Sequence, residues 1–356
     1  MSLSILIPTY NTLVTDLVDT LCQQIKAANR QIVKSSNLDD AWEIIVIDDG
    51  SKDETVKSSN RQIQQFPHCR FIENKTNVGR AAIRNQLAKE AQFEWLLFID
   101  ADMQICSDNY LNDYIQFITQ PQPAQVICGH YTLPTHSSSP SLREPEVAVP
   151  EQSEGGKAIG LGVGSVTSLR YLYEQRSLKL HSLAWRQQNP YRAFKVCNTV
   201  IHRSIFNTIS FNQQITGYGY EDLLFAESLK AQGVPVTHID NPVVFSHFES
   251  NEAFICKTEE SLAQLARQPL QLSQLQQTAK RLTSLHLHKP FLLLYKHRKN
   301  AWRNKLINIP HSTSPSLREP EVAVPEQSEG GKAIGLGVGP YHLLQAYKLG
   351  YYLTLL

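Results

Sequence analysis

Short apolar runs alternate with longer segments of helical spacing over the first hundred residues. We predict strands at the apolar runs, which are residues 4–8, 43–47, 70–73 and 95–99. Helical spacing of apolar positions lies between them, at residues 13–28 and 77–90. Nearly continuous apolar strands that alternate with helices are typical of a parallel sheet covered on both faces. The pattern therefore predicts an α/β fold with a mostly parallel central sheet flanked by helices.

The rest of the chain has a mixed pattern before it becomes helical. We predict a helix at residues 166–180, a strand within 195–203, and a helix at 221–231 that begins with two carboxylates. Two short strands are expected within residues 234–245. From residue 252 onward the periodicity predicts helices. We therefore expect a main domain over residues 1–250 and a helical C-terminal region over residues 251–356.

Residues 139–164 recur letter for letter as residues 314–339. Structural repeats diverge and come in arrays, so we interpret the two copies as inserted elements. Both are rich in Pro, Glu, Ser and Gly, a composition that favours a flexible surface loop. Their glycines lack the spacing of a phosphate-binding loop or a Rossmann fingerprint, which argues against a nucleotide site there.

Composition and charge narrow the class of protein. The chain has 34 Lys and Arg against 33 Asp and Glu, and this balance argues against a dedicated nucleic-acid binder. The six cysteines form no Cys-x-x-Cys pair, which favours free thiols in a reducing compartment. The first residues lack the pattern of a secretory signal, and no apolar stretch is long enough to span a membrane. We therefore expect a cytoplasmic protein.

An acidic pair follows the fourth predicted strand. Asp100 and Asp102 come directly after the apolar run at residues 95–99. Burying unpaired charge is costly, so two carboxylates at the end of a buried strand need a cation as partner. Together they suit a hard divalent ion, Mg²⁺ or Mn²⁺, that bridges the phosphates of a nucleotide. The alternative is a pair of solvated turn or helix-cap residues.

Other polar clusters fall near the same edge of the predicted sheet, where ligands of parallel sheets bind. Asp48 and Asp49 follow the second strand, where one Asp can accept a hydrogen bond from a base or ribose, or else form a turn. Arg84, on the helix at residues 77–90, is either a phosphate or base contact or a surface residue. Glu221 and Asp222 begin a helix whose N-terminus favours their ionised form, which makes Asp222 a candidate general base.

An ordered series of segments resembles the motif set of glycosyltransferase family 2. The segments are ILIPTYN at residues 5–11, IDDGS at 47–51, NVGRAAIRN at 77–85, FIDADM at 98–103, residues 198–203, and GYGYED at 217–222. The resemblance covers roughly residues 1–250, apart from the insertion. It implies the GT-A fold, which has a Rossmann-like nucleotide-binding half. It also implies an inverting enzyme that moves a sugar from a nucleoside-diphosphate sugar, with UDP as the expected nucleotide, to a hydroxyl acceptor.

The resemblance also implies roles for the matching residues. The residues expected to contact the donor are Pro8, Thr9, Tyr10, Asp48, Asp49, Arg84, Asp100 and Asn198. Asp102 would ligate Mg²⁺ or Mn²⁺, assisted by Asp100 and by His247, although a lone histidine is also often structural. Glu221 would bind acceptor or sugar hydroxyls, and Asp222 would be the general base. The metal and its carboxylates would neutralise charge on the departing diphosphate, and no covalent sugar intermediate is expected.

Two other functions use similar residues. A nucleotidyltransferase that makes nucleotide-sugars also has an acidic metal site, but it normally carries a Gly-rich loop after the first strand, where this chain has Thr9 to Thr12. A non-catalytic carbohydrate-binding derivative of the fold would not need Asp100, Asp102 and Asp222 together. We therefore prefer the transferase, acting in polysaccharide, glycolipid or cell-envelope biosynthesis.

The C-terminal region has a basic and aromatic stretch. Lysines and arginines at residues 296–305 stand among Tyr295, Trp302 and leucines, without an acid between them. Such a stretch is either a solvated helix face or a surface for anionic membranes. The last segment, residues 341–356, is apolar and either packs against this helix or enters the membrane interface, but it is too short to span. We expect peripheral attachment to the inner face of the cell membrane.

Overall fold

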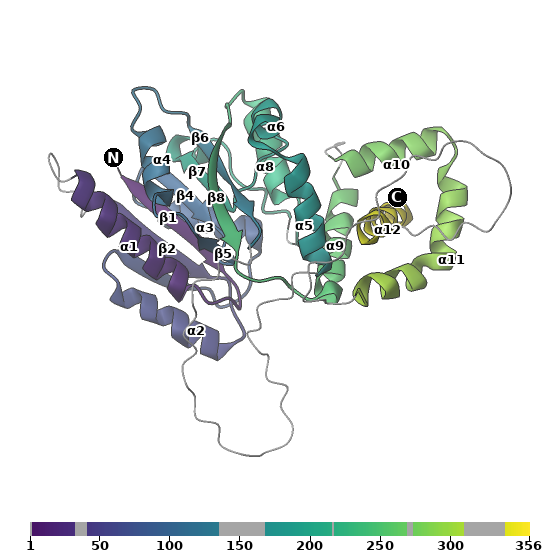
Figure 1. Cartoon of the computed structure of the whole chain (residues 1–356), viewed down its shortest axis with the longest axis horizontal. Coiled ribbons are helices and arrows are strands. Elements are labelled where there is room, and N and C mark those ends of the chain that lie inside the picture. Colours follow the sequence, from purple (N-terminus) through teal and green to yellow (C-terminus); the bar gives the residue numbers. More distant parts are fainter. Residues whose placement is uncertain (1, 33–40, 135–167, 216, 269–272, 310–338) are drawn as a thin grey trace, which may run out of the picture. The chain divides into compact units, whose positions relative to one another are not determined.

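The structure, a computed structural model, describes residues 2–32, 41–134, 168–215, 217–268, 273–309 and 339–356. Apart from Gly339, both copies of the repeated segment lie outside these residues, so their interpretation as flexible loops stays a prediction. The chain divides into two compact units, Met1–Leu161 with Ser177–His247, and Gly162–Arg176 with Phe248–Leu356. Figure 1 shows the strands in the first unit and only helices in the second.

An eight-stranded sheet forms the framework of the first unit, in the order β3-β2-β1-β4-β7-β6-β8-β5. Its parallel half comprises β1 (Leu3–Thr9), β2 (Trp42–Asp48), β3 (Cys69–Glu73) and β4 (Trp95–Ile99). The connections contain α1 (Thr15–Ile32), α2 (Glu54–Arg61), a short 3₁₀ helix (Gln62–Gln65) and α3 (Arg80–Glu90). The apolar runs thus predicted all of these strands, with ends that differ by at most one residue.

The other half of the sheet mixes strand directions. It comprises β5 (Met103–Ile105), β6 (Val126–Thr132), β7 (Asn198–His202) and β8 (Thr237–Phe245). β7 is antiparallel to both β4 and β6, β6 and β8 are parallel, and β5 is antiparallel to β8. The helices of this half are α4 (Tyr110–Ile118), α6 (Leu183–Gln188), α7 (Arg203–Phe206) and α8 (Glu221–Ala231). The expected α/β fold, with a mainly parallel sheet flanked by helices, is confirmed.

Two local predictions differ from the structure. Where we predicted two strands around Asn241 and Pro242, β8 is one strand, because its register against β6 shifts between Cys128 and His130. Such an irregularity accommodates a proline, which cannot donate to the ladder. The helix predicted from residue 77 begins instead at Arg80, because Gly79 before it has a φ of 90°.

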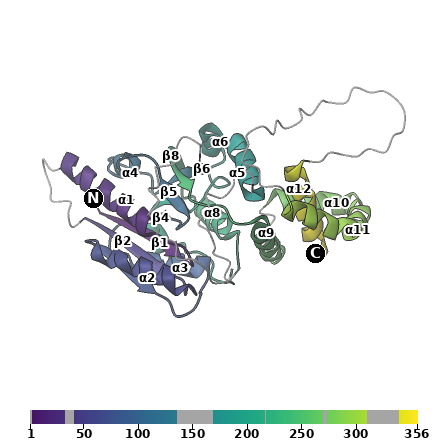
Figure 2. The same cartoon turned by 60° about the horizontal axis from the view of Figure 1, so that its bottom comes forward.

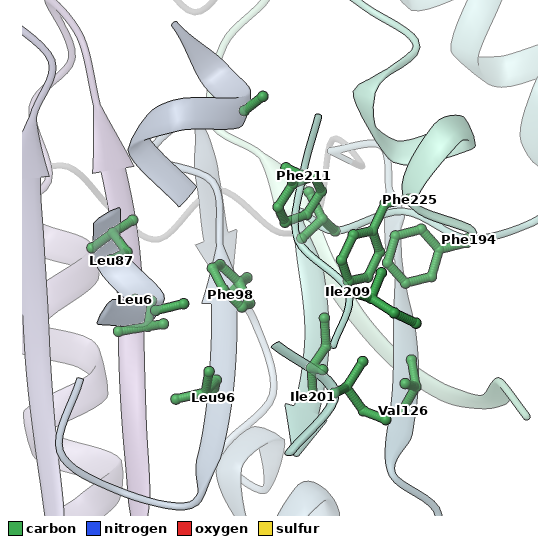
Figure 3. Close-up of a cluster of buried hydrophobic side chains, with 14 of the residues drawn as sticks. Leu6, Leu87, Leu96, Phe98, Val126, Phe194, Ile201, Ile209, Phe211 and Phe225 are labelled. Carbon is green, nitrogen blue, oxygen red and sulfur yellow. The ribbon is translucent and has the colours of Figure 1, made fainter. Parts of the chain in front are cut away.

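Helices cover both faces of the sheet. On one face, Leu87 of α3 and Phe225 of α8 join Leu6 and Phe98 of the sheet in a buried cluster (Figure 3). Burying one such side chain contributes about 1.5–3 kcal/mol. Figure 2 shows α1 and α4 on the face opposite α3. There Gln24 of α1 accepts a hydrogen bond from the backbone N–H of α4, at 3.1 Å. The sheet therefore lies between two helical layers.

The second unit is a small helical assembly. It contains the first part of α5 (Leu169–Leu180), α9 (Asn251–Ala266), α10 (Gln274–Ser284), α11 (His288–Ile307) and α12 (Pro340–Leu355). Tyr295 of α11 and Tyr347 of α12 are fully buried at its centre, with ring centroids 5.8 Å apart. No helix in the described part of the chain is long and apolar enough to cross a membrane. The expected helical C-terminal region is thus present.

Candidate active site

The ends of β1, β2 and β4 meet the beginning of β7 at one edge of the sheet. Thr9 pairs with Asp48 at the ends of β1 and β2. Because β7 is antiparallel to β4, its first residue, Asn198, lies opposite Ile99, the last residue of β4. The fold therefore brings the polar clusters of the sequence together from segments that are far apart along the chain.

Asp48 ends β2 with one carboxylate oxygen engaged. Ser51 donates to Asp48 Oδ1 twice, through its backbone N at 3.0 Å and its Oγ at 2.5 Å. Asp48 Oδ2 is buried and has no hydrogen-bond partner among the residues described. A buried oxygen without a partner costs free energy. The geometry thus leaves Asp48 Oδ2 able to accept a hydrogen bond from a ligand.

Asp49 has a different environment. Its two carboxylate oxygens accept hydrogen bonds from the backbone N–H groups of Val78 and Gly79, at 2.7 and 3.0 Å. These bonds fix the loop that leads into α3. Gly50 follows with φ of 72°, and a Cβ on it would lie 2.7 Å from the carbonyl carbon of Thr76. Asp49 therefore positions this loop, and its contact with a nucleotide stays a prediction.

The residues that follow β1 present one exposed ring. Thr9 is buried and Pro8 is half-buried, whereas the side chain of Tyr10 is 41% exposed. The backbone N–H of Asn11 donates to Ser51 Oγ at 2.6 Å, which ties this segment to the end of β2. An exposed aromatic ring can stack on a base, and this role of Tyr10 stays a prediction.

Arg84 connects two acidic side chains. Its Nη2 lies 2.9 Å from Asp100 Oδ1 and its Nη1 lies 3.1 Å from Glu221 Oε1. Arg80, one turn earlier on α3, lies 3.8 Å from Glu221 and 4.5 Å from the centre of the Tyr218 ring. Burial would raise the pKa of Asp100, but Arg84 and then Arg80 outweigh it and hold that pKa below its usual value. Asp100 is therefore ionised and fixed in place.

Asp222 has one unpaired carboxylate oxygen. Its Oδ2 accepts a hydrogen bond from the backbone N–H of Val196 at 3.3 Å. Its Oδ1 is buried and has no hydrogen-bond partner in the described part of the chain. Burial, and next the charge of Glu221, raise the pKa of Asp222 to about 6. A carboxylate with a pKa close to neutrality is well suited to general base catalysis.

Asp102 and His247 come close together just beyond the pairing of β5 with β8. The backbone N and the Oγ of Ser246 donate to the Asp102 carbonyl oxygen, at 2.8 and 3.0 Å. The same Ser246 Oγ lies 3.0 Å from His247 Nδ1. The structure thus places His247 beside the acidic segment, although the two residues are far apart in the sequence.

Asp100, Asp102 and His247 are the predicted metal ligands. Among the described residues, no group of three His, Cys, Asp or Glu side chains is arranged to hold a metal ion. However, Mg²⁺ is usually bound by one or two carboxylates together with substrate phosphates. A bound diphosphate would supply the remaining ligands, and ligation of Mg²⁺ or Mn²⁺ by Asp102, Asp100 and His247 stays a prediction.

Asn198 uses its whole amide within the protein. Its Oδ1 accepts hydrogen bonds from the hydroxyls of Tyr110 and Tyr114, at 2.8 and 2.7 Å. Its Nδ2 donates to the carbonyl oxygens of His130 and Asn241, at 2.8 and 2.7 Å. An amide side chain has two donor and two acceptor positions, and all four are occupied here. This arrangement supports a positioning role, and contact of Asn198 with the donor sugar stays a prediction.

Some residues of the site are missing from our sequence predictions. Tyr110 and Tyr114 lie on α4 with the four-residue spacing of one helix face, but only the fold shows that they meet Asn198. Arg80 precedes Arg84 by one helical turn, so its proximity to Glu221 follows from the spacing once α3 is known. Ser51 was part of the IDDGS segment, and its hydroxyl could have been paired with Asp48.

The fold is of the α/β class, with acidic residues gathered at one edge of its sheet, and comparison with known proteins identifies its family. Residues 4–179 match the family described as "Glycosyl transferase family 2". This part of the chain belongs to glycosyltransferase family 2, and the protein is a transferase. The resemblance inferred from the ordered motifs is therefore confirmed.

Individual relatives are more distant. An uncharacterized glycosyltransferase of Haemophilus influenzae is 28% identical over 235 residues, which are 60% of this chain and 73% of that protein. The poly(ribitol-phosphate) beta-glucosyltransferase of Bacillus spizizenii is 32% identical over 117 residues, which are 32% of this chain and only 17% of that enzyme. Among solved structures, S. aureus TarS 1–349 in complex with UDP-GlcNAc has 18% identity and a TM-score of 0.43, with 76% of this chain and 68% of that chain covered.

Proposed function

We propose that the protein is an inverting glycosyltransferase that moves a sugar from a nucleoside-diphosphate sugar, with UDP as the expected nucleotide, to a hydroxyl acceptor. The observation that carries this proposal is the state of Asp222. Its buried, unpartnered Oδ1 and its pKa of about 6 equip it to take a proton at neutral pH. With that pKa, about 90% of the carboxyl group is ionised at pH 7.

The proposed reaction is a single displacement. The acceptor hydroxyl oxygen forms a bond to the anomeric carbon of the donor sugar, and its proton moves to Asp222 Oδ1. The bond between the anomeric carbon and the diphosphate oxygen breaks on the opposite face, and the electron pair leaves with the nucleoside diphosphate. The configuration at the anomeric carbon is therefore inverted, and no carboxylate has to attack the sugar.

Other residues bind and orient the donor in this proposal. Asp48 Oδ2 accepts a hydrogen bond from the base or ribose, and the exposed Tyr10 ring stacks on the base. Asp102, with His247 beside it, holds Mg²⁺ or Mn²⁺, and this ion, when bound, neutralises charge on the departing diphosphate. Arg84 keeps Asp100 ionised and in a fixed place, where it would contact the ribose or assist in holding the ion.

The proposed acceptor is a hydroxyl of a saccharide or glycolipid in polysaccharide or cell-envelope biosynthesis. The name of the Bacillus relative, which acts on poly(ribitol-phosphate), supports an envelope acceptor. We place the enzyme in the cytoplasm at the inner face of the membrane, where nucleotide-sugars and growing lipid-linked chains are both present. The helical second unit, with its basic C-terminal helices, supports that location.

A donor screen tests the proposal. Release of nucleoside diphosphate from a panel of nucleotide-sugars is measured with Mg²⁺ or Mn²⁺ for the wild type and for Asp102→Asn, Asp222→Asn and Asp108→Asn. Asp108 is an exposed aspartate and serves as the matched control. We expect Asp102→Asn to weaken metal-dependent donor binding, and Asp222→Asn to lose turnover but still bind donor.

Two results would contradict the proposal. The first is that the protein binds no nucleotide-sugar and that Asp102→Asn changes neither binding nor turnover. The other is formation of a nucleotide-sugar from a nucleoside triphosphate and a sugar 1-phosphate, which would indicate a nucleotidyltransferase instead.

A further inference from the structure

The turn between α10 and α11, together with the start of α11, exposes large apolar side chains. In the turn, Leu285 and Leu287 are 66% and 51% exposed. On α11, Leu293 and Leu294 are 73% and 49% exposed. Soluble proteins rarely expose large apolar patches, and such a patch normally marks a surface that binds a partner.

Basic side chains accompany these leucines. The exposed lysines and arginines of α10 and α11 are Lys280, Arg281, Lys289, Lys296, Arg298 and Lys305. The sequence contains no Asp or Glu between Glu260 and Glu319, so no acid of these two helices offsets their charge. A surface that combines cations with exposed leucines is complementary to a partner with both negative charge and an apolar interior.

The spacing along α11 places the cations and leucines on its outer face. Lys289, Leu293 and Lys296 are separated by four and then three residues, so they share one side of the helix. The opposite side carries Tyr295 and Leu306, which are fully buried in the core of the second unit. α11 is therefore divided lengthwise into a core side and a basic, apolar outer side.

The acids that lie nearest to α11 are on its core side. Glu259 of α9 is 3.4 Å from Arg303, which is half-buried, and it accepts a hydrogen bond from the Tyr347 hydroxyl. Lys299 also turns inward, with its Nζ 5.4 Å from the centre of the Tyr351 ring. The inward-facing cations of α11 thus have partners, and the outer cations face away from these acids.

We propose that this surface binds an anionic phospholipid bilayer. The surface, called the α10–α11 surface below, consists of Leu285, Leu287, Leu293, Leu294, Lys289 and Lys296. The leucines would enter the boundary between headgroups and acyl chains, while the lysines reach lipid phosphates. A soluble phosphate compound would use the cations but not the leucines. The inference deepens the membrane location given in the proposed function and rests on that part of it. Vesicle binding is measured without a sugar donor, so its failure can be told apart from failure of the donor screen.

The structure changes which residues take part in membrane contact. Tyr295 and Trp302, which the sequence placed in a basic and aromatic membrane surface, pack in the core of the second unit. The last helix, α12, also packs inward through Leu343, Leu344 and Tyr347 instead of presenting its apolar residues outward. The contact is therefore assigned to the turn and the outer leucines, and not to the aromatic residues.

Vesicle flotation with the full-length chain tests this inference. Binding is measured to vesicles of phosphatidylcholine alone and of phosphatidylcholine with phosphatidylglycerol, at low and high salt. The variants are Lys289→Glu/Lys296→Glu for the charge and Leu285→Ser/Leu293→Ser for the apolar contribution. The controls are Lys89→Glu/Lys230→Glu and Leu180→Ser, which change exposed residues of other helices.

We expect binding that requires phosphatidylglycerol and weakens with salt. The double lysine variant should bind roughly 30-fold more weakly or worse, since each basic residue near an anionic surface contributes about 1 kcal/mol, or about fivefold. The double leucine variant should also lose binding, and the controls should bind like the wild type. Thermal unfolding of each variant checks that it is folded.

Three outcomes would overturn the inference: no binding to anionic vesicles, equal binding to both kinds of vesicle, or equal loss in the controls. A fourth outcome would also overturn it. The wild type would be a dimer in gel filtration, and Leu285→Ser/Leu293→Ser would be a monomer that binds vesicles as well as the wild type does. That result would assign the surface to a second copy of the chain.

Discussion

Arg84 of α3 lies 3.1 Å from Glu221 of α8, although the two residues are 137 positions apart in the sequence. The same guanidinium binds Asp100 at the end of β4 at 2.9 Å. One buried cation therefore fixes two acidic segments of the site relative to each other.

Removing this cation should strongly destabilise the first unit. In Arg84→Met, the buried Glu221 loses its closest cation, and Asp100 loses the cation that donates a hydrogen bond to it. We therefore expect the free energy of unfolding to fall by about 3–5 kcal/mol. Urea denaturation followed by tryptophan fluorescence measures it. The matched control is Arg61→Met, which breaks an exposed ion pair with Glu73 and should have a much smaller effect. Equal losses in the two variants would contradict our view of Arg84.

The pH profile of the reaction should show the titration of Asp222. The base must be ionised to accept a proton, so kcat/KM should rise with pH through about 6 and level off above it. Below that pH, activity should fall roughly tenfold per unit, because only the unprotonated fraction reacts. Initial rates at saturating metal, from about pH 4.5 to 8, test this prediction. A profile that stays flat through pH 6 would speak against Asp222 as the base.

The fall of kcat/KM below about pH 6, the acidic limb of the profile, should shift when Glu221 is changed. The negative charge of Glu221 is the second cause of the raised pKa of Asp222, after burial. In Glu221→Gln that charge is gone, so the pKa of Asp222 falls and the acidic limb should move to lower pH. The measurement is again kcat/KM against pH, and a structural defect alone would lower the rate without moving the limb.

Gly129→Ala should disturb the amide network around Asn198. A Cβ on Gly129 would lie 2.4 Å from Asn198 Nδ2 and 2.6 Å from the Tyr114 hydroxyl, where no side chain fits without displacing both. We expect a loss of about 1–3 kcal/mol in stability, together with lower activity. The control is Gly233→Ala, where a Cβ meets nothing within 4 Å but the backbone has φ of 68°. That variant should cost about 1 kcal/mol and leave kcat unchanged.

Gly350→Ala should destabilise the second unit although alanine is the better helix former. Helix propensity alone would add about 1 kcal/mol of stability. However, a Cβ on Gly350 would lie 2.1 Å from Cδ2 of the Tyr295 ring, which is fully buried and cannot move aside freely. Thermal unfolding of Gly350→Ala, alone and combined with Tyr295→Ala, measures the conflict. In the Tyr295→Ala background, the substitution of Gly350 should become neutral or stabilising.

The parallel half of the fold could be predicted from the sequence because each of its strands is an uninterrupted apolar run. β2 and β4 are buried along their whole length, which leaves a clear signal. β5 is only three residues long, and β6 ends in half-buried residues, so neither gives such a signal. Pro242 in β8 suggested a break, and only the pairing with β6 shows why the strand continues.

The candidate site was predictable as a set of residues but not as a set of contacts. The order of the motifs indicated the family, and the fold brings their polar ends together. The sequence could not show that Asp49 binds backbone N–H groups or that Asn198 uses its whole amide, because those partners come from other elements. The hydrogen-bond partners of buried polar groups depend on tertiary packing, and a local sequence pattern does not show which partners the packing brings together.

The antiparallel pairing of β7 with β4 also bears on how the enzyme is made. The parallel strands β1 to β4 all precede β7 on the growing polypeptide, so they emerge from the ribosome first. Glu221 and Asp222 emerge more than a hundred residues after Arg84 and Asp100. Contacts over such separations form slowly. In an incomplete chain, the sheet is therefore only partly formed and Arg84 lacks its partner Glu221. The enzyme should become active only when α8 docks, late in folding.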